Sequence, residues 1–242
     1  MFADAIRVMD EYGNECAVRY EGFDAHEGQT VEFPVISLWD ARNRPADDSE
    51  RRRRIENNRV NCFPVEFGRY RRCRLDSLAD DFDANAIAQA EMFVTRVCHG
   101  AQGGLVLYGL PGTGKTTLAA AICNELTDRG RRCRMTTLGA IVEARFDAKS
   151  NTKRAIEPYV ACDLTVIDDI GGEFANRGRV EICEEVLNAL AGSGARLLFT
   201  TNLTLQQLSE PRESTARVVG RIVEAGRLVQ VTGRDYRQGG LT

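Results

Sequence analysis

The chain has 242 residues, 43% of them hydrophobic, which suits one ordinary domain with an appendage or two small domains and excludes wholesale disorder. No run of about 18 uncharged apolar residues predicts a membrane-spanning helix, and no secretory leader is recognisable. Eight scattered cysteines, none in a C-x-x-C pair, favour a cytoplasmic protein with reduced thiols and no membrane partner.

The net charge of −3 hides an uneven distribution along the chain. Residues 1–50 carry 12 acidic residues and 4 arginines, whereas residues 51–75 carry 9 arginines and 2 glutamates. We therefore expect an acidic N-terminal segment over 1–50, a basic linker over 51–82 and a larger domain over 83–242. Because an acidic surface repels nucleic acid, the expected target of the segment 1–50 is another protein.

The first part of the chain gives weak structural signals. Residues 2–9 are compatible with a short amphipathic helix, and residues 30–39 alternate like a strand that Pro34 confines to a sheet edge. Helices are predicted over 49–60, after a polar run that can cap the helix, and over 84–98, where apolar residues recur at helical spacing.

From residue 104 onward, short apolar strands alternate with helices. Strands are predicted at 104–108, 132–136, 164–167, 195–201 and 228–231, and helices at 115–129, 138–146, 180–190 and 214–224. Alternation of this kind predicts a parallel sheet with helices on both faces. The expected fold class is therefore α/β, with a five-stranded parallel sheet preceded by a small N-terminal segment.

The strongest motif is a glycine-rich loop between the first of these strands and the next helix. Residues 109–116 read Gly-Leu-Pro-Gly-Thr-Gly-Lys-Thr and match G-x-x-x-x-G-K-[ST] at every fixed position. Backbone N–H groups of such a loop surround phosphates, Lys115 reaches the β- and γ-phosphates, and the Thr116 hydroxyl binds Mg²⁺. The alternative is a glycine-rich turn without a ligand. The residues expected to bind ATP are Gly109, Pro111, Gly112, Thr113, Gly114, Lys115, Thr116 and Thr117.

The rarity of lysine supports this interpretation. The chain has 29 arginines and only 3 lysines, yet the loop carries Lys115. A planar guanidinium cannot replace a compact ammonium group between phosphates, so the chemistry of the loop explains why a lysine stands there.

Two acids follow the strand predicted at 164–167. Ligands of open α/β sheets lie at the carboxyl ends of strands, so Asp168 and Asp169 are predicted to be catalytic. Asp168 would hold Mg²⁺ through water, and Asp169 would orient or deprotonate the attacking water. Asp169 is shorter than the glutamate of many ATPases, which leaves room for slow hydrolysis or for help from Glu173. The alternative is a pair of acids that only cap the strand.

Three further polar residues extend the candidate site. Asn202 follows the strand at 195–201 and is expected to sense the γ-phosphate, although an isolated asparagine there is usually a turn residue. Arg217 and Arg221 lie four residues apart on one helix face, which by itself indicates a solvated surface. Beside an ATPase motif, these arginines are candidates to reach the γ-phosphate of a neighbouring subunit, as an arginine finger does.

Together these motifs resemble the DnaC/DnaI-type replicative helicase loaders of the AAA+ class, and the related IstB-type ATPases share much of the same core. The resemblance covers roughly residues 55–237 and rests on the loop at 109–116, Leu-Ala-Ala-Ala-Ile-Cys-Asn-Glu-Leu at 118–126, Val-Ile-Asp-Asp-Ile-Gly at 166–171, Thr201-Asn202, Arg217 and Arg221. It implies an AAA+ fold, ATP hydrolysis between protomers of a self-associated assembly, single-stranded DNA as a ligand and a hexameric replicative DNA helicase as a partner. It also favours Arg221 as the finger.

The same resemblance places the helix at 138–146 on the DNA-facing side. The segment before residue 50 matches no pattern of the family. Candidates for phosphate contacts near that helix are Arg145, Lys149, Lys153 and Arg154, and the alternative is an ordinary charged surface.

Three other functions stay open. An IstB-like transposition ATPase would bind DNA without a helicase partner. A nucleotide-binding switch with little hydrolysis fits the short side chain of Asp169. A small-molecule P-loop kinase is disfavoured, since about 100 residues precede the loop and no arginine-rich lid is recognisable between the later strands.

Overall fold

The computed structural model describes residues 5–9, 15–19, 36–37, 48–147, 151–171 and 177–236. Near the N-terminus, antiparallel strands pair in the order β1 (Ala5–Met9), β2 (Glu15–Arg19) and β3 (Ile36–Ser37). The helix expected over 2–9 is wrong where the chain is described, because residues 5–9 pair with β2 as a strand. Of the strand expected at 30–39, only β3 falls within the described residues.

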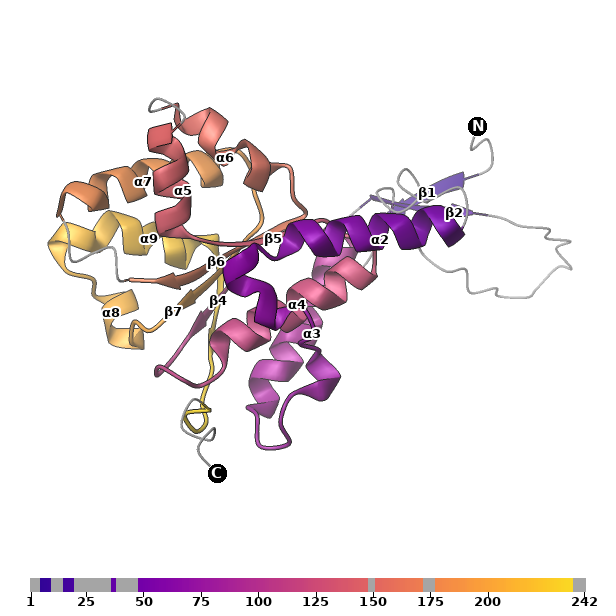
Figure 1. Ribbon diagram of the computed structural model, residues 1–242, viewed down its shortest axis with the longest axis horizontal. Helices are drawn as coiled ribbons and strands as arrows, with labels where there is room; N and C mark the ends of the chain where they lie inside the picture. The colour runs from indigo at the N-terminus through magenta and orange to yellow at the C-terminus, as the bar shows by residue number, and fades with distance from the viewer. Residues whose placement is uncertain are drawn as a thin grey trace, which may run out of the picture.

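A five-stranded sheet forms the centre of the molecule (Figure 1). Its strands are β4 (Gly104–Tyr108), β5 (Cys133–Thr137), β6 (Leu164–Ile170), β7 (Leu197–Thr201) and β8 (Gly226–Gln230). The order is β5-β6-β7-β4-β8 and every neighbouring pair is parallel, which confirms the predicted fold class. The carboxyl ends of all five strands therefore lie at one edge of the sheet.

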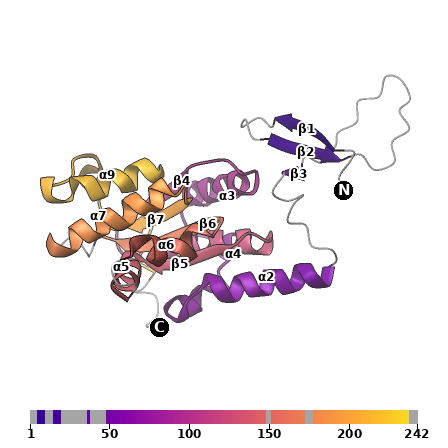
Figure 2. The same ribbon diagram turned by 90° about the horizontal axis from the view of Figure 1, so that it is seen from above.

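Helices cover both faces of this sheet (Figure 2). They are α2 (Asp48–Cys62), α3 (Ala84–Cys98), α4 (Lys115–Asp128), α5 (Leu138–Asp147), α6 (Thr152–Val160), α7 (Arg177–Gly192), α8 (Leu205–Ser209) and α9 (Ala216–Ala225), with 3-10 turns η1 (Val65–Tyr70), η2 (Leu75–Ser77) and η4 (Glu213–Thr215). Sequence patterning misses α6, because this helix is short and contains Pro158. Within the described ranges, none of these helices is long and apolar enough to cross a membrane.

Alternation of side chains along the strands builds one apolar core on each face. On β4, Leu105 and Leu107 pack in a cluster with α3 and α4, whereas Val106 packs in a cluster with α5, α7 and α9. All three side chains are buried, and each such burial stabilises the fold by about 1.5–3 kcal/mol. Packing on both faces holds the strand ends in place, and the polar residues that follow the strands are held with them.

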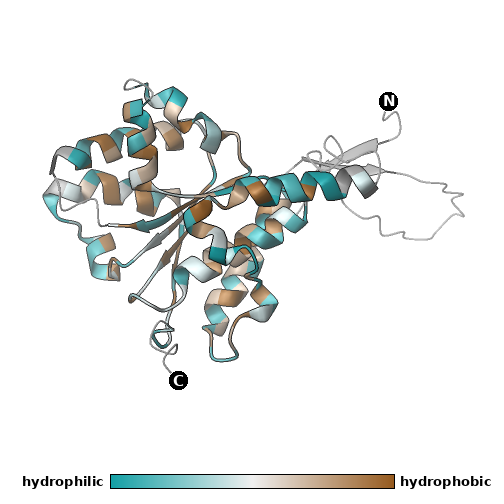
Figure 3. Ribbon diagram, viewed as in Figure 1, coloured by the Kyte–Doolittle hydropathy of each residue, from teal (hydrophilic) through white to brown (hydrophobic). Residues whose placement is uncertain are grey.

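The linker expected over 51–82 packs against the sheet layer in this structure. α2 is hydrophilic along most of its length (Figure 3). The chain after α2 nevertheless buries Phe63, Phe67 and Leu75 in the same core cluster as α3 and α4. Because these apolar side chains share one core with the sheet, the segment 51–82, here called the neck, belongs to the packed body.

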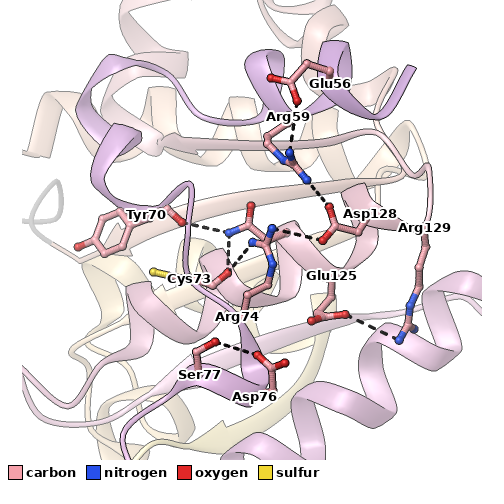
Figure 4. Close-up of polar contacts among 11 residues, drawn as sticks. Glu56, Arg59, Tyr70, Cys73, Arg74, Asp76, Ser77, Glu125, Asp128 and Arg129 are labelled. Atoms are coloured by element: carbon pink, nitrogen blue, oxygen red, sulfur yellow. Dashed lines mark hydrogen bonds and ion pairs between the residues drawn. The ribbon is translucent and has the colours of Figure 1, made fainter. Parts of the chain in front are cut away.

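Polar contacts fasten the neck to the last turns of α4 (Figure 4). Arg59 donates to Asp128 Oδ1 at 2.6 Å, and Arg74 lies 3.3 Å from the other oxygen of the same carboxylate. The fully buried Asn124 donates to two backbone oxygens of the neck. Because α4 begins at the glycine-rich loop, these contacts tie the neck to the helix that carries the candidate site.

Asn124→Ala is expected to lower the free energy of unfolding by about 2 kcal/mol, because the carbonyls of Tyr70 and Cys73 lose their donor. Urea unfolding followed by circular dichroism measures the change. Ser77→Ala is the matched control, since Ser77 donates to Asp76 on the exposed surface and its loss should cost less than about 0.5 kcal/mol. Equal effects of the two substitutions would show that Asn124 does not hold the neck.

Candidate functional site

A pocket of about 610 Å³ opens at the carboxyl edge of the sheet. Its walls come from the glycine-rich loop, from the ends of β5, β6 and β7, from η1 and from the chain that follows β8. The fold thus brings residues from widely separated parts of the sequence to one place, as open α/β sheets do with their ligand sites.

The glycine-rich loop and the first turn of α4 form one side of the pocket. Lys115 is buried, and its ammonium group donates to the backbone oxygens of Gly109 and Leu110 at 3.0 and 2.7 Å. The Thr113 hydroxyl also donates to the oxygen of Leu110, at 3.0 Å. Of the residues expected to bind ATP, Thr113 and Gly109 do not line the pocket. The other residues expected to bind ATP do line it, namely Pro111, Gly112, Gly114, Lys115, Thr116 and Thr117.

Asp168 faces this loop from the end of β6. The carboxylate is only 8% exposed and accepts hydrogen bonds from Thr116 Oγ1 at 2.9 Å and from Thr200 Oγ1 at 2.6 Å. Burial raises the pKa of Asp168 above its ordinary value of 3.8, and the neighbouring Asp169 adds to the rise, whereas the two hydroxyl donors oppose it. The group is therefore a buried acid that a cation would stabilise in its charged form.

Asp169 lies at an irregularity of the sheet. β6 continues to Ile170, beyond the end expected from the sequence, and its register against β7 shifts around Asp169. The φ angle of Asp169 is +54°, a left-handed conformation that costs a non-glycine residue about 1 kcal/mol. Its N–H donates to Thr200 Oγ1 at 2.8 Å, and its carboxylate accepts from Asn202 Nδ2 at 2.7 Å. The bulge therefore places Asp169 beside Asn202 at the pocket.

The donor set at this edge fits Mg²⁺. The Thr116 hydroxyl and the Asp168 carboxylate are adjacent hard oxygen donors, and Mg²⁺ is typically held by one or two protein oxygens together with waters and phosphates. In the part of the chain that the structure describes, no three His, Cys, Asp or Glu side chains are grouped to hold a metal. The pocket therefore suits an ion shared with a phosphate ligand, not a metal caged by protein alone.

The two arginines of α9 lie outside this pocket. Arg217 has 83% of its side chain exposed and lies 3.6 Å from Glu184 of α7. Arg221 is held more firmly, because its Nε donates to Asn188 Oδ1 at 2.6 Å and its Nη1 to Glu224 at 2.8 Å. The structure thus does not bring either arginine to the glycine-rich loop of its own chain.

The residues expected to contact DNA lie in different surroundings in the structure. Arg145 lies 2.5 Å from Glu185 Oε2 in an ion pair whose carboxylate is exposed, and this carboxylate offsets the charge of Arg145, whose phosphate contact stays a prediction. Lys153 and Arg154 are exposed on α6. Two other residues singled out from the sequence, Lys149 and Glu173, lie outside the described residues.

Sequence reasoning misses several residues of the pocket. Phe67, Arg69 and Tyr70 of η1 line it, and the Arg69 guanidinium lies 4.7 Å from the centre of the Tyr70 ring. Thr200 is also missed, although a threonine within a strand of buried apolar residues is a signal that its hydroxyl has a partner. Tyr236 completes the pocket from the C-terminal side, and no motif in the sequence pointed to it.

Comparisons with known proteins agree with this geometry. Residues 79–240 match the family described as IstB-like ATP binding protein. The replicative helicase loader DnaC of Escherichia coli K12 is 30% identical over 130 residues, which are 52% of this chain and 53% of DnaC. The chain therefore spans about half the length of the curated relatives it matches.

Solved structures support the same fold. A crystal structure of DnaI has a TM-score of 0.56 and 23% identity, and the match covers 74% of this chain and 98% of DnaI. A crystal structure of the DnaC helicase loader has a TM-score of 0.56 and 22% identity, with 68% of this chain and 99% of that chain covered. At these identities the likeness establishes the fold alone.

Asp168→Asn is expected to change how stability depends on pH. The folded pKa of Asp168 lies above its unfolded value, so the folded state binds the proton more tightly. The stability that this group contributes is complete below the unfolded pKa and is lost as pH rises through the folded pKa. The variant should therefore gain stability relative to the wild type as the pH rises from about 4, the ordinary value of an aspartate, through the raised pKa of Asp168.

Thermal unfolding of both proteins across this range, without nucleotide or Mg²⁺, measures the difference. A difference in melting temperature that stays constant over the whole range would contradict the raised pKa.

Proposed function

Because the chain belongs to the IstB-like ATP-binding protein family, we propose that it hydrolyses ATP and uses the energy to load a replicative DNA helicase onto single-stranded DNA. The observation that carries the proposal is the joined set of Lys115, Thr116, Asp168 and Asn202 in one pocket. The similarity to the loader DnaC supports the choice of partner.

Each polar residue of the pocket has a role in this reaction. The N–H groups of the loop and the Lys115 ammonium bind the phosphates, and Lys115 exchanges its two backbone acceptors for phosphate oxygens. Asp169 orients the attacking water and accepts its proton, while Asn202 keeps the Asp169 carboxylate in place. Thr116 and Asp168 would hold Mg²⁺, which neutralises negative charge on the phosphates.

A neighbouring protomer completes the site. The arginines of α9 lie away from the pocket of their own chain, so a nucleotide that they reach would be the one bound by another copy. Arg221 is proposed as the finger that stabilises the transition state, with Arg217 beside it. Its hydrogen bonds to Asn188 and Glu224 hold the side chain until assembly offers a phosphate instead.

The remaining parts of the chain are proposed to bind partners. The acidic segment 1–50 is assigned to the helicase, because its charge disfavours DNA. Lys153 and Arg154 are assigned to single-stranded DNA, since both are exposed cations of α6. We retain the division into this segment, the neck and an ATP-binding domain over 83–242, with the neck packed on the domain.

Lys115→Ala and Arg221→Ala are each expected to abolish ATP turnover, and mixing the two variants should restore part of it. Random pairing leaves about a quarter of the interfaces with both an intact loop and an intact finger. Phosphate release with Mg²⁺ and single-stranded DNA measures turnover, and Ser77→Ala, an exposed change away from the pocket, is the control that keeps an unaltered ATP site. Wild-type turnover by Lys115→Ala would refute the site, and absence of rescue at every mixing ratio would refute the finger.

A second function is favoured by the family match itself, namely a transposition ATPase that binds DNA without a helicase. The loader is expected to co-purify with the hexameric replicative helicase of its source organism, and deletion of residues 1–50 should abolish this complex while leaving ATP binding intact. Light scattering and affinity purification report the complex. If the complex is absent and the protein forms ATP-dependent filaments on long duplex DNA, the result would favour a transposition ATPase.

A further inference from the structure

The chain after β8 returns across the glycine-rich loop. Val231 N–H donates to the oxygen of Tyr108 at 2.8 Å, which extends the pairing of β8 with β4 by one bond. Five residues later, Tyr236 N–H donates to the oxygen of Gly112 at 3.1 Å, inside the loop itself. We call residues 231–236 the C-terminal strap.

The strap is anchored on the short segment that precedes α3. Thr232 donates to Asp83 Oδ2 from its backbone N–H at 2.9 Å and from its hydroxyl at 2.6 Å. The Tyr236 hydroxyl donates to Asp81 at 3.1 Å, and Arg234 lies 2.9 Å from the same carboxylate. Asp83 also caps α3, so the strap is attached at a helix start that is itself fixed.

An aromatic pair joins the strap to the hydrophobic core. The Tyr236 ring stacks on Phe82 with centroids 5.8 Å apart and an interplanar angle of 17°. Phe82 is buried in the core cluster that also holds the first turns of α4. The position of Tyr236 is therefore set by a rigid neighbour.

The loop is in close contact with this support. Gly112 and Gly114 both have positive φ, at +84° and +89°. A Cβ at Gly112 would overlap the Asp235 carboxylate, and one at Gly114 would overlap the Phe82 ring. Positive φ favours glycine at both positions, and the Phe82 ring also requires it at Gly114, whereas a Cβ at Gly112 would meet the end of the Asp235 side chain.

Tyr236 also contacts the candidate nucleotide pocket. The residue lines the pocket together with Gly112, Lys115 and Tyr70. The same side chain thus touches the support beneath the loop and the space where the nucleotide would lie. A phosphate loop binds through several N–H groups at once, so any freedom that it keeps must be lost on binding and lowers affinity.

We propose that the C-terminal strap positions the glycine-rich loop for nucleotide binding, with Tyr236 as its principal positioning residue. The proposal rests on the proposed nucleotide site. It assigns to the strap the task of holding the loop in the binding conformation before a nucleotide arrives, through the Tyr236 N–H on Gly112 and the Tyr236 ring on Phe82.

The test measures the Kd of a fluorescent ATP analogue with Mg²⁺ for the full chain and its variants, together with melting temperatures with and without nucleotide. Tyr236→Ala keeps the backbone N–H on Gly112 but removes the ring that stacks on Phe82, and should raise Kd by about tenfold. Tyr236→Phe keeps the ring and the backbone N–H and should stay within about twofold of the wild type. The double variant Thr232→Val with Arg234→Ala removes the exposed contacts of the strap with Asp83 and Asp81. It should raise Kd by about threefold.

The outcomes separate the two proposals. If the wild type binds the analogue and Lys115→Ala does not, the nucleotide site stands. Wild-type Kd in both Tyr236→Ala and the double variant would then overturn the strap alone, even if their melting temperatures fell. Equal binding by the wild type and Lys115→Ala would overturn the site and the strap together. If Tyr236→Ala does not fold, the double variant decides, and a wild-type Kd there would overturn the strap.

Discussion

The candidate site depends on one buried carboxylate. Asp168 lies where water barely reaches, and a buried acid is tolerated only if hydrogen bonds or a cation replace its hydration. Thr116 from α4 and Thr200 from β7 supply those bonds, and Thr200 also accepts the N–H of Asp169. A single hydroxyl therefore links the acid, the bulge and the neighbouring strand. Without this hydroxyl, Asp168 would depend on the hydrogen bond from Thr116, and Asp169 on the one from Asn202.

The sequence predicted the sheet, and it singled out residues that the structure gathers around the glycine-rich loop. Both predictions rest on local information, because apolar runs mark strands, and a loop motif has fixed spacing. The sequence alone predicted that the two acids near the end of β6 and Asn202 after β7 lie close together, since parallel strands end at one edge of the sheet. The exact positions of these side chains could not be predicted, because β6 continues to Ile170 and bulges at Asp169. A bulge does not change the hydrophobic pattern of the sequence in a recognisable way.

What the sequence did not reveal depends on contacts between distant segments. Phe67 and Tyr70 look like ordinary residues of a basic stretch until the neck folds back on α4. Arg145 looks like a free cation until α7 presents Glu185 to it. In each case the partner lies far along the chain, so that no window of the sequence holds both members.

The place of β4 in the sheet has a consequence for how the molecule comes into being. β4 pairs only with β7 and β8 in the described sheet, and both follow it far along the chain. During synthesis, β4 therefore stays without a strand partner until the chain has been made as far as β7. Its two exposed edges are ready to pair with other chains during that interval. The interval before β7 is complete is therefore the stage at which wrong strand pairing of β4 has the best opportunity.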